Sequence, residues 1–169
     1  MKIKIFALTH KKFEVPQDKM YQPLQVGREG KEDLGYLCDN TGDNISAENC
    51  YYSELTGLYW IWKNVHAYKY VGSCHYRRYL LNEQEKIFTE TEYLELLKDY
   101  DLITTKRVVL NNSYHYGFAT NHNIHALDMT GEVIKELYPE YYDTFVQLVN
   151  GTETYFGNMI VTSKKWFDT

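Results

Sequence analysis

The 169-residue sequence contains few cysteines and no long apolar segment. Its three cysteines (Cys38, Cys50 and Cys74) are odd in number and show no CxxC spacing, which excludes a disulfide framework and indicates a reducing compartment. No run approaches the roughly 20 apolar residues that cross a bilayer, and residues 1–8 lack the apolar core of a signal peptide. We therefore expect a cytoplasmic protein without a transmembrane segment, with peripheral association at the inner face of the membrane as the only membrane role.

The sequence is also poor in basic residues. Its 18 Lys and Arg residues against 23 Asp and Glu residues give a formal net charge of −5. A protein that binds nucleic acid usually carries a basic stripe. We therefore expect no nucleic-acid partner.

Several common catalytic motifs are missing as well. There is no Walker loop, no GxGxxG, no GxSxG nucleophile elbow and no HExxH. His122 and His125 have the i, i+3 spacing of a metal-binding pair, but no third ligand follows at a recognised spacing. An EF-hand loop starting at Asp39 would need Glu at its twelfth position, which is Cys50. We therefore predict no metal site.

Aromatic residues, in contrast, are abundant. The chain has 17 Tyr, 7 Phe and 3 Trp, which make up 16% of its residues. Tyrosine suits carbohydrate and nucleotide sites because it offers an apolar face and a polar tip. It also fills ordinary cores and oligomer interfaces, so the aromatic content leaves both interpretations open and the oligomeric state undetermined.

The order of the expected elements is typical of an α/β domain. Strands are expected at residues 2–8, 70–74, 101–105 and 154–162, where apolar and β-branched residues gather. Helices are expected at residues 53–64, with Ser53 as N-cap, at 124–137 and at 140–149. A capping box at Thr89 begins another helix, and Ser163 caps a last one. We predict a single domain over residues 1–169, truncated at its C-terminus because the last helix ends after one turn.

The most distinctive segment is residues 70–80, in which a short apolar strand ends in a basic cluster. His75, Arg77 and Arg78 follow the strand directly. Open α/β sheets bind ligands beyond the carboxyl ends of their strands, and Arg matches phosphate through two parallel bonds. The sequence thus favours an anion site; the alternative is an exposed loop whose arginines pair with acidic residues. Thr9 and His10 follow the first strand, where a base and ribose would bind.

The sequence resembles the GT-A glycosyltransferases, and more closely the bacterial domain of unknown function 4422 of capsular and exopolysaccharide synthesis proteins. The resemblance to GT-A enzymes lies in the helix 53–64, the strand 70–74 and the later segments YFGNMIV (155–161) and KKW (164–166). The segments that match the bacterial domain are IFALTHK (5–11), QVG (25–27), DNTGDNI (39–45), YSELTGLYW (52–60), WKN (62–64) and HYRRY (75–79).

This resemblance implies a GT-A-like fold, with a mixed sheet between two layers of helices, three layers in all. It also implies transfer of a hexose from a nucleotide sugar, a UDP-hexose above all, to a capsular or exopolysaccharide acceptor, either a glycan or a lipid-linked saccharide. The alternative is a non-catalytic carbohydrate-binding or assembly domain. A fold of this kind needs a cation to neutralise the departing diphosphate.

The resemblance also assigns roles to individual residues. Where GT-A enzymes hold Mn²⁺ or Mg²⁺ with Asp-x-Asp, this chain has His75-x-Arg77, so we expect His75, Arg77 and Arg78 to replace the metal at the diphosphate. Thr9 and His10 would contact the nucleotide, and Asn158 the sugar or the acceptor. The donor or acceptor candidates are Asp43, Asn44, Tyr52, Glu54 and Lys63. Glu54 and Asp128 are alternatives for the carboxylate base of an inverting transfer.

Overall fold

A computed structural model describes residues 2–169, which form two compact units. The first unit comprises the chain up to Thr105 together with Asn158–Thr169, and the second comprises Lys106–Gly157. The chain therefore leaves the first unit once and returns to it near its end. Each unit is described by itself.

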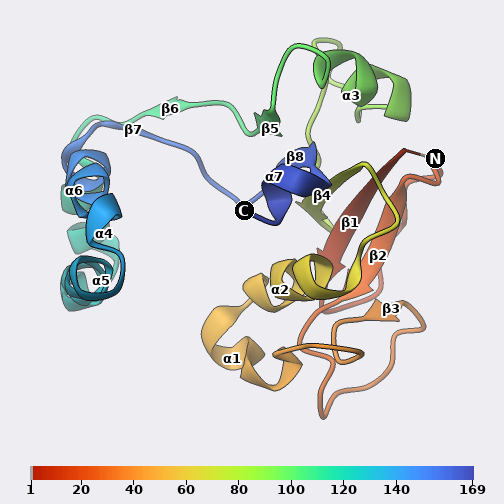
Figure 1. The fold of residues 1–169 in the computed structure, drawn as a ribbon, viewed down its shortest axis with the longest axis horizontal. Helices are drawn as coiled ribbons and strands as arrows, with labels where there is room; N and C mark the ends of the chain where they lie inside the picture. Colours follow the sequence, from red (N-terminus) through yellow and green to blue (C-terminus); the bar gives the residue numbers. More distant parts are fainter. Residues whose placement is uncertain (1) are drawn as a thin grey trace. The chain divides into compact units, whose positions relative to one another are not determined.

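The first unit is built on a mixed sheet of six strands (Figure 1). The strands lie in the order β3-β2-β1-β4-β8-β5. The first four are parallel to one another, whereas β8 runs antiparallel to both β4 and β5. The predicted mixed sheet is confirmed. Its strands are β1 (Ile3–Thr9), β2 (Tyr21–Gln25), β3 (Leu37–Cys38), β4 (Tyr70–His75), β5 (Leu102–Thr104) and β8 (Ile160–Ser163).

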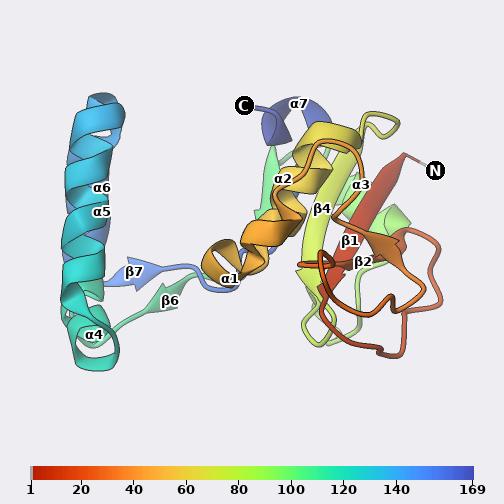
Figure 2. The ribbon, with the colours of Figure 1, turned by 90° about the horizontal axis from the view of Figure 1, so that it is seen from below.

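The central strand β1 is apolar on both faces, so both faces of the sheet need a cover. Ile3 and Ile5 point to the face that carries α3 (Glu90–Leu96), where Tyr93 packs. Phe6 and Leu8 point to the opposite face, which α2 (Leu55–Asn64) and α7 (Lys164–Phe167) cover. Figure 2 shows α2 lying across this face. The predicted helices on both sides of the sheet are thus confirmed.

Two of the predicted helix caps are confirmed, and one is wrong. Thr89 forms the predicted capping box with Glu92, and the Ser163 hydroxyl accepts the predicted bond from Trp166 N. Ser53, in contrast, is not the N-cap of α2. A 3₁₀ turn (Ser46–Glu48) and a short helix α1 (Asn49–Tyr52) precede it, and Ser53 has φ 48°. α2 therefore begins at Leu55, after Glu54.

The predicted strand at residues 154–162 is wrong in its first half. Gly157 and Asn158 have φ values of 103° and 48°, which do not fit extended backbone. The strand β8 consequently starts only at Ile160, and Glu153–Thr154 form a separate short strand, β7.

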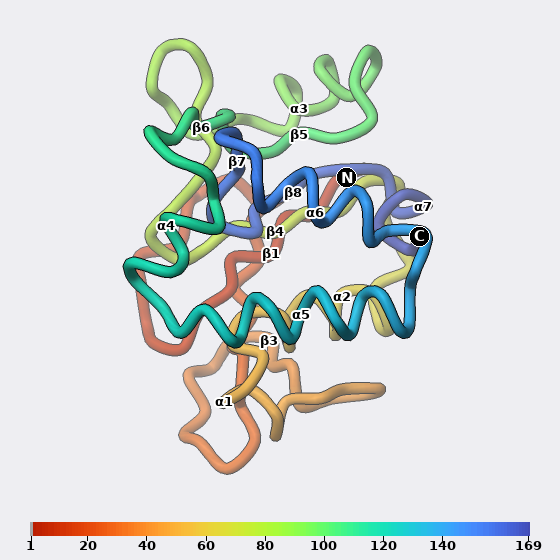
Figure 3. Tube along the Cα trace, turned by 90° about the vertical axis from the view of Figure 1, so that its left-hand side faces the viewer, coloured from red at the N-terminus to blue at the C-terminus, as the bar shows by residue number. Residues whose placement is uncertain are grey.

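The second unit is mainly helical (Figure 3). Its helices α4 (Tyr114–Asn121), α5 (Ile124–Leu137) and α6 (Tyr142–Asn150) pack on one another, with a 3₁₀ turn at Pro139–Tyr141 and a ribbon of β6 (Val108–Val109) and β7. Gly131 lets α5 approach α6, since a Cβ there would lie 2.9 Å from the Phe145 ring. The helix predicted at residues 124–137 is confirmed. Within the described residues no helix has the length and apolarity needed to span a membrane.

Gly72→Ala should destabilise the first unit by about 1–3 kcal/mol, the usual range for overpacking. Its Cβ would lie 2.6 Å from the Ile160 carbonyl oxygen, and the strand backbone cannot yield as a flexible side chain does. All three tryptophans (Trp60, Trp62 and Trp166) belong to the first unit. Urea unfolding followed by tryptophan fluorescence therefore measures this unit.

Gly117→Ala in α4 is the matched control, because its Cβ would meet nothing within 4 Å and it lies in the second unit. It should leave the fluorescence transition unchanged. An unaltered midpoint for Gly72→Ala would contradict the tight packing of β4 on β8.

Candidate functional site

The candidate site lies where the strand order reverses. From β1 the chain continues outward to β2 and β3 on one side, and β4 is added on the other side of β1. Open α/β sheets bind ligands in the crevice beyond the carboxyl ends of such strands. A cavity of about 500 Å³, here called the switch-point pocket, lies at this edge. It is lined by Leu8, Thr9, His10, Val26, Lys31, Asn49, Ser53, Glu54, His75, Tyr76, Arg77 and Arg78.

The basic cluster sits on a tight turn that is fixed to the sheet. His75 and Arg78 exchange backbone hydrogen bonds of 3.2 and 3.0 Å, and Tyr76 N donates to the Leu8 carbonyl at the end of β1. The Tyr76 ring packs edge-on against His10, and the Arg77 guanidinium lies 4.8 Å from its centre. The Tyr76 hydroxyl is buried without a hydrogen-bond partner in the described part of the chain. The turn therefore presents both arginines on a rigid support.

The charges that line the pocket are mainly positive. Arg77, Arg78 and Lys31 contribute cations, and Glu54 is the one carboxylate in the lining. No ion pair joins Arg77 or Arg78 to a carboxylate among residues 2–169. Both arginines are exposed, as the alternative expectation of a loop had it, but the pairing with acidic residues that it included is absent. A pocket of this kind attracts an anion.

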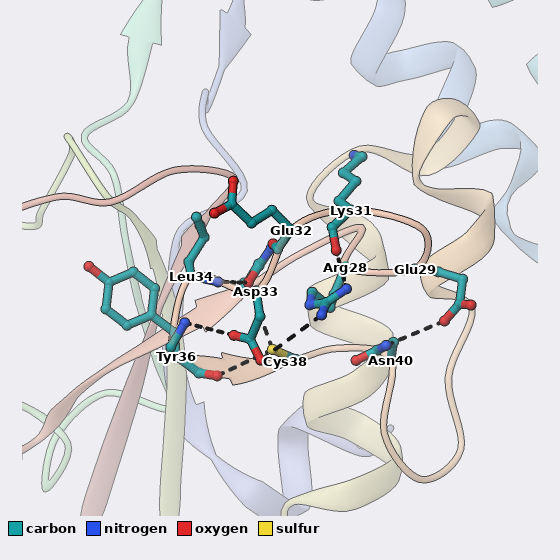
Figure 4. Close-up of polar contacts among 11 residues, drawn as sticks. Arg28, Glu29, Lys31, Glu32, Asp33, Leu34, Tyr36, Cys38 and Asn40 are labelled. Atoms are coloured by element: carbon teal, nitrogen blue, oxygen red, sulfur yellow. Dashed lines mark hydrogen bonds and ion pairs between the residues drawn. The ribbon is translucent and has the colours of Figure 1, made fainter.

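Lys31 reaches the pocket on the loop of residues 26–36, which has a dense polar network of its own (Figure 4). The Gln25 amide, buried under the loop, donates to Glu32 O and accepts from Leu34 N. Arg28 bonds the Lys31 carbonyl and lies 4.0 Å from Asp33. These bonds give the loop of residues 26–36 a fixed shape.

Asp39 joins this loop to α2. Its side chain is fully buried and accepts four hydrogen bonds. Two come from the backbone N–H groups of Gly27 and Arg28, at 2.8 and 3.1 Å. The other two come from the hydroxyls of Ser46 and Thr56, at 2.5 and 2.7 Å. One carboxylate thus fixes both the loop that carries Lys31 and the start of the helix next to Glu54.

The Glu54 carboxylate is held by Asn158, which lies just before β8. Asn158 Nδ2 donates to Glu54 Oε1 at 2.9 Å, and the Asn158 carbonyl accepts from the buried Ser73 hydroxyl at 3.0 Å. Because β8 is antiparallel to β4, its first residues lie at the same edge of the sheet as the end of β4. The structure therefore brings two predicted residues from distant parts of the sequence into contact.

Six of the predicted site residues line the switch-point pocket: Thr9, His10, Glu54, His75, Arg77 and Arg78. Within this group Thr9 has a structural task, since its buried hydroxyl donates to Lys11 O and accepts from Lys11 N. Asn158 joins the group through Glu54.

The other predicted residues lie elsewhere. Asp43 accepts from the Tyr59 hydroxyl, and Asn44 bonds within its own turn. The Lys63 ammonium lies 3.5 Å from the centre of the Trp62 ring, in the last turn of α2. Tyr52 is exposed on α1. Asp128 belongs to the second unit, where its carboxylate lies 3.7 Å from His115.

Sequence reasoning missed four polar residues of the lining: Lys31, Asn49, Ser53 and Tyr76. Tyr76 lies inside the recognised basic motif and could have been found there. Lys31 occurs in a segment without periodicity, and only the glycines around it indicate a turn. Nothing in the sequence indicates the left-handed backbone of Ser53.

A larger apolar cavity, of about 660 Å³, lies along another face of α2. Leu55, Trp62 and Trp166 are among its lining residues, and Asp101 is its one ionisable carboxylate. It has no cation in its lining and is therefore less suited to an anionic ligand than the switch-point pocket.

The site does not suit thiolate chemistry, and its lining contains a single carboxylate. Cys74 precedes the basic turn, but burial raises its pKa to about 12 and keeps the thiol protonated. Residues 2–169 contain no group of three His, Cys, Asp or Glu side chains arranged to hold a metal ion. The pocket offers one carboxylate, Glu54, among several cations, and these cations would repel a divalent ion.

Asp39→Asn should lower the free energy of unfolding of the first unit by about 3 kcal/mol. The amide nitrogen would face two of the four buried donors, and hydrogen bonds to a charged group contribute about 1.5–3 kcal/mol each. Urea unfolding followed by tryptophan fluorescence measures the change.

Asp43→Asn, on the same segment but exposed, is the control and should change stability by less than about 0.5 kcal/mol. Equal effects of the two substitutions would contradict the central role of the Asp39 carboxylate.

Comparisons with known proteins agree with the predicted resemblance. The family model described as a domain of unknown function (DUF4422) matches residues 4–169. No curated protein is significantly similar to the chain.

Among solved structures, the apo form of WbbM, a bifunctional glycosyltransferase, is similar to this chain, with a TM-score of 0.86 and 29% sequence identity. The match covers 99% of this chain and 35% of WbbM, so the chain spans about a third of the length of that protein. The fold of the chain is thus that of part of a glycosyltransferase. Since the family match extends over nearly all of its residues, the chain belongs to the DUF4422 family.

Proposed function

We propose that the chain is a glycosyltransferase with a GT-A-like fold over residues 1–169, and that the switch-point pocket binds the nucleotide-sugar donor. The observation that carries this proposal is the pair Arg77 and Arg78, which lie on a hydrogen-bonded turn and line a cavity at the carboxyl ends of β1 and β4. The similarity to WbbM supports the reaction class.

The proposed donor is a UDP-hexose and the acceptor a capsular or exopolysaccharide chain, either as a glycan or as a lipid-linked saccharide. The His10 and Tyr76 rings offer apolar edges at the end of β1, where a nucleotide base would be met. A nucleotide-sugar donor also fits the cytoplasmic location expected from the cysteines.

In the proposed reaction the bond between the anomeric carbon and the diphosphate oxygen breaks, and UDP leaves with the electron pair. The acceptor oxygen forms the new bond to the anomeric carbon and loses its proton. The guanidiniums of Arg77 and Arg78, with His75 and Lys31, stabilise the negative charge that develops on the diphosphate. Fixed cations at this place take the role that a metal ion has in enzymes with Asp-x-Asp.

Arg77→Ala should weaken UDP binding at least tenfold, because a guanidinium that bonds phosphate contributes about 1.5–3 kcal/mol. Arg77→Lys should give an intermediate loss, since it keeps the charge but not the planar fork. Isothermal titration calorimetry with UDP measures both. Lys98→Ala is the control, because it removes an exposed cation that forms an ion pair with Glu95. It should leave UDP binding unchanged.

Chelation of divalent metal should leave UDP binding and transfer intact. The experiment compares release of UDP from a panel of UDP-hexoses, with a bacterial glycan acceptor, before and after treatment with EDTA. Activity that EDTA abolishes and Mn²⁺ restores would overturn the role of the arginines. A protein that binds the glycan and ignores UDP would instead be a carbohydrate-binding or assembly domain.

A further inference from the structure

Two residues with strained backbone conformations lie next to Glu54, one in the chain and one in space. Among the described residues three that are not glycine have positive φ: Ser53 (48°), Asn158 (48°) and Glu85 (59°). Ser53 is the neighbour of Glu54 in the chain, and Asn158 bonds its carboxylate. Such backbone conformations cost about 1–3 kcal/mol each and occur preferentially at functional sites. Their meeting at one carboxylate, the only one that lines the pocket, points to a role for that group.

Glu54 does not perform the usual task of an acidic residue at a helix start. It occupies the N-cap position of α2, yet its side chain accepts no capping hydrogen bond from the helix. Within residues 2–169, the single hydrogen bond recorded for its carboxylate comes from Asn158 Nδ2. One carboxylate oxygen is thus held and the other is left for a ligand.

The backbone on both sides of this contact is fixed. Asn158 is tied to β4 by the bond from the Ser73 hydroxyl to its carbonyl. Ser53 is tied by Asn49, whose amide donates to the Ser53 carbonyl at 2.6 Å and to Thr56 Oγ1 at 3.1 Å. Thr56 in turn donates to Asp39. Both strained conformations are therefore held by side-chain hydrogen bonds, and their joint result is the placement of one side chain.

We propose that Glu54 is the base of the transfer and that Asn158 is its positioning residue. This inference rests on the proposed function and deepens it. The proton of the acceptor hydroxyl passes to the Glu54 carboxylate while the acceptor oxygen bonds the anomeric carbon and UDP departs with its electron pair. Asn158, which the sequence suggested as a contact of the sugar, acts through Glu54: its amide fixes one carboxylate oxygen so that the other faces the acceptor.

Glu54→Gln should lower kcat for transfer at least a hundredfold and leave the affinity for UDP within twofold of the wild type. The amide keeps an oxygen for the Asn158 bond but cannot accept the acceptor proton at neutral pH. Steady-state UDP release gives kcat, and calorimetry gives the affinity. An equal loss of UDP binding would assign Glu54 to the donor and overturn its role as base.

Two substitutions separate positioning by Asn158 from a structural role. Asn158→Gly removes the amide and relieves the left-handed backbone, so the melting temperature should stay equal or rise while kcat falls about tenfold with KM for the UDP-hexose unchanged. Asn158→Asp keeps the shape of the side chain but cannot donate to a carboxylate, and should lower kcat at least as much. Glu85→Gly, which relieves a positive φ at a turn outside the pocket lining, should leave kcat unchanged.

Each result has a distinct meaning. If the wild-type protein is active and both Asn158 variants keep kcat within twofold of it, the positioning role of Asn158 is wrong. The proposed function is not affected by that result. A fall in kcat that only accompanies a fall in melting temperature would make Asn158 a structural residue and overturn it as well. Wild-type protein that binds UDP but releases it from no UDP-hexose would overturn the proposed function and this inference together.

Discussion

The geometry of the switch-point pocket depends on one buried carboxylate. Asp39 lies outside the lining, but its four hydrogen bonds join the loop of residues 26–36 to the segment before α2. Burying a charge is costly unless hydrogen bonds satisfy it, so a carboxylate with four donors holds them together strongly. Gly27 belongs to the same arrangement, since a Cβ there would lie 2.3 Å from the Asn49 side chain. Two pocket walls that come from different parts of the chain are thereby fixed to each other.

The opposite wall depends on the sheet. The basic turn is fixed because Tyr76 bonds the last residues of β1 and because β4 lies between β1 and β8. The fixed backbone keeps both guanidiniums at the pocket before an anion binds, and the Tyr76 ring also holds the Arg77 side chain, which favours affinity. A metal ion at this place would need carboxylate ligands, and a carboxylate repels a diphosphate when the metal is absent. Permanent guanidinium charges avoid that requirement, because arginine stays protonated.

The sequence predicted much of this arrangement and missed specific parts of it. The strands β1 and β4, the capped helices α3 and α7 and the helix α5 follow from local patterns of apolar and capping residues. The basic turn was recognisable because its charges directly follow a buried strand. Asn158 was not predictable in the same way, because its carbonyl is held by Ser73, which is far away in the sequence and close only in the folded chain. The positive φ of Ser53 has a local partner in Asn49, but no known sequence pattern indicates this contact. Lys31 escaped for a similar reason, since the buried Gln25 amide shapes its loop from below.

The late return of the chain to its first unit has a consequence for folding during synthesis. β8 fits between β4 and β5, so the six-stranded sheet cannot close until residues 160–163 have left the ribosome. Residues 106–157 emerge earlier and form contacts mostly among themselves. They can therefore fold while β4 and β5 are still unpaired on the sides that β8 will occupy. Until then the unpaired edge of β4 is open to aggregation. The pairing of β8 with β4 also brings Asn158 into contact with Glu54. A nascent chain therefore completes its pocket only when the edge of β4 is protected from aggregation.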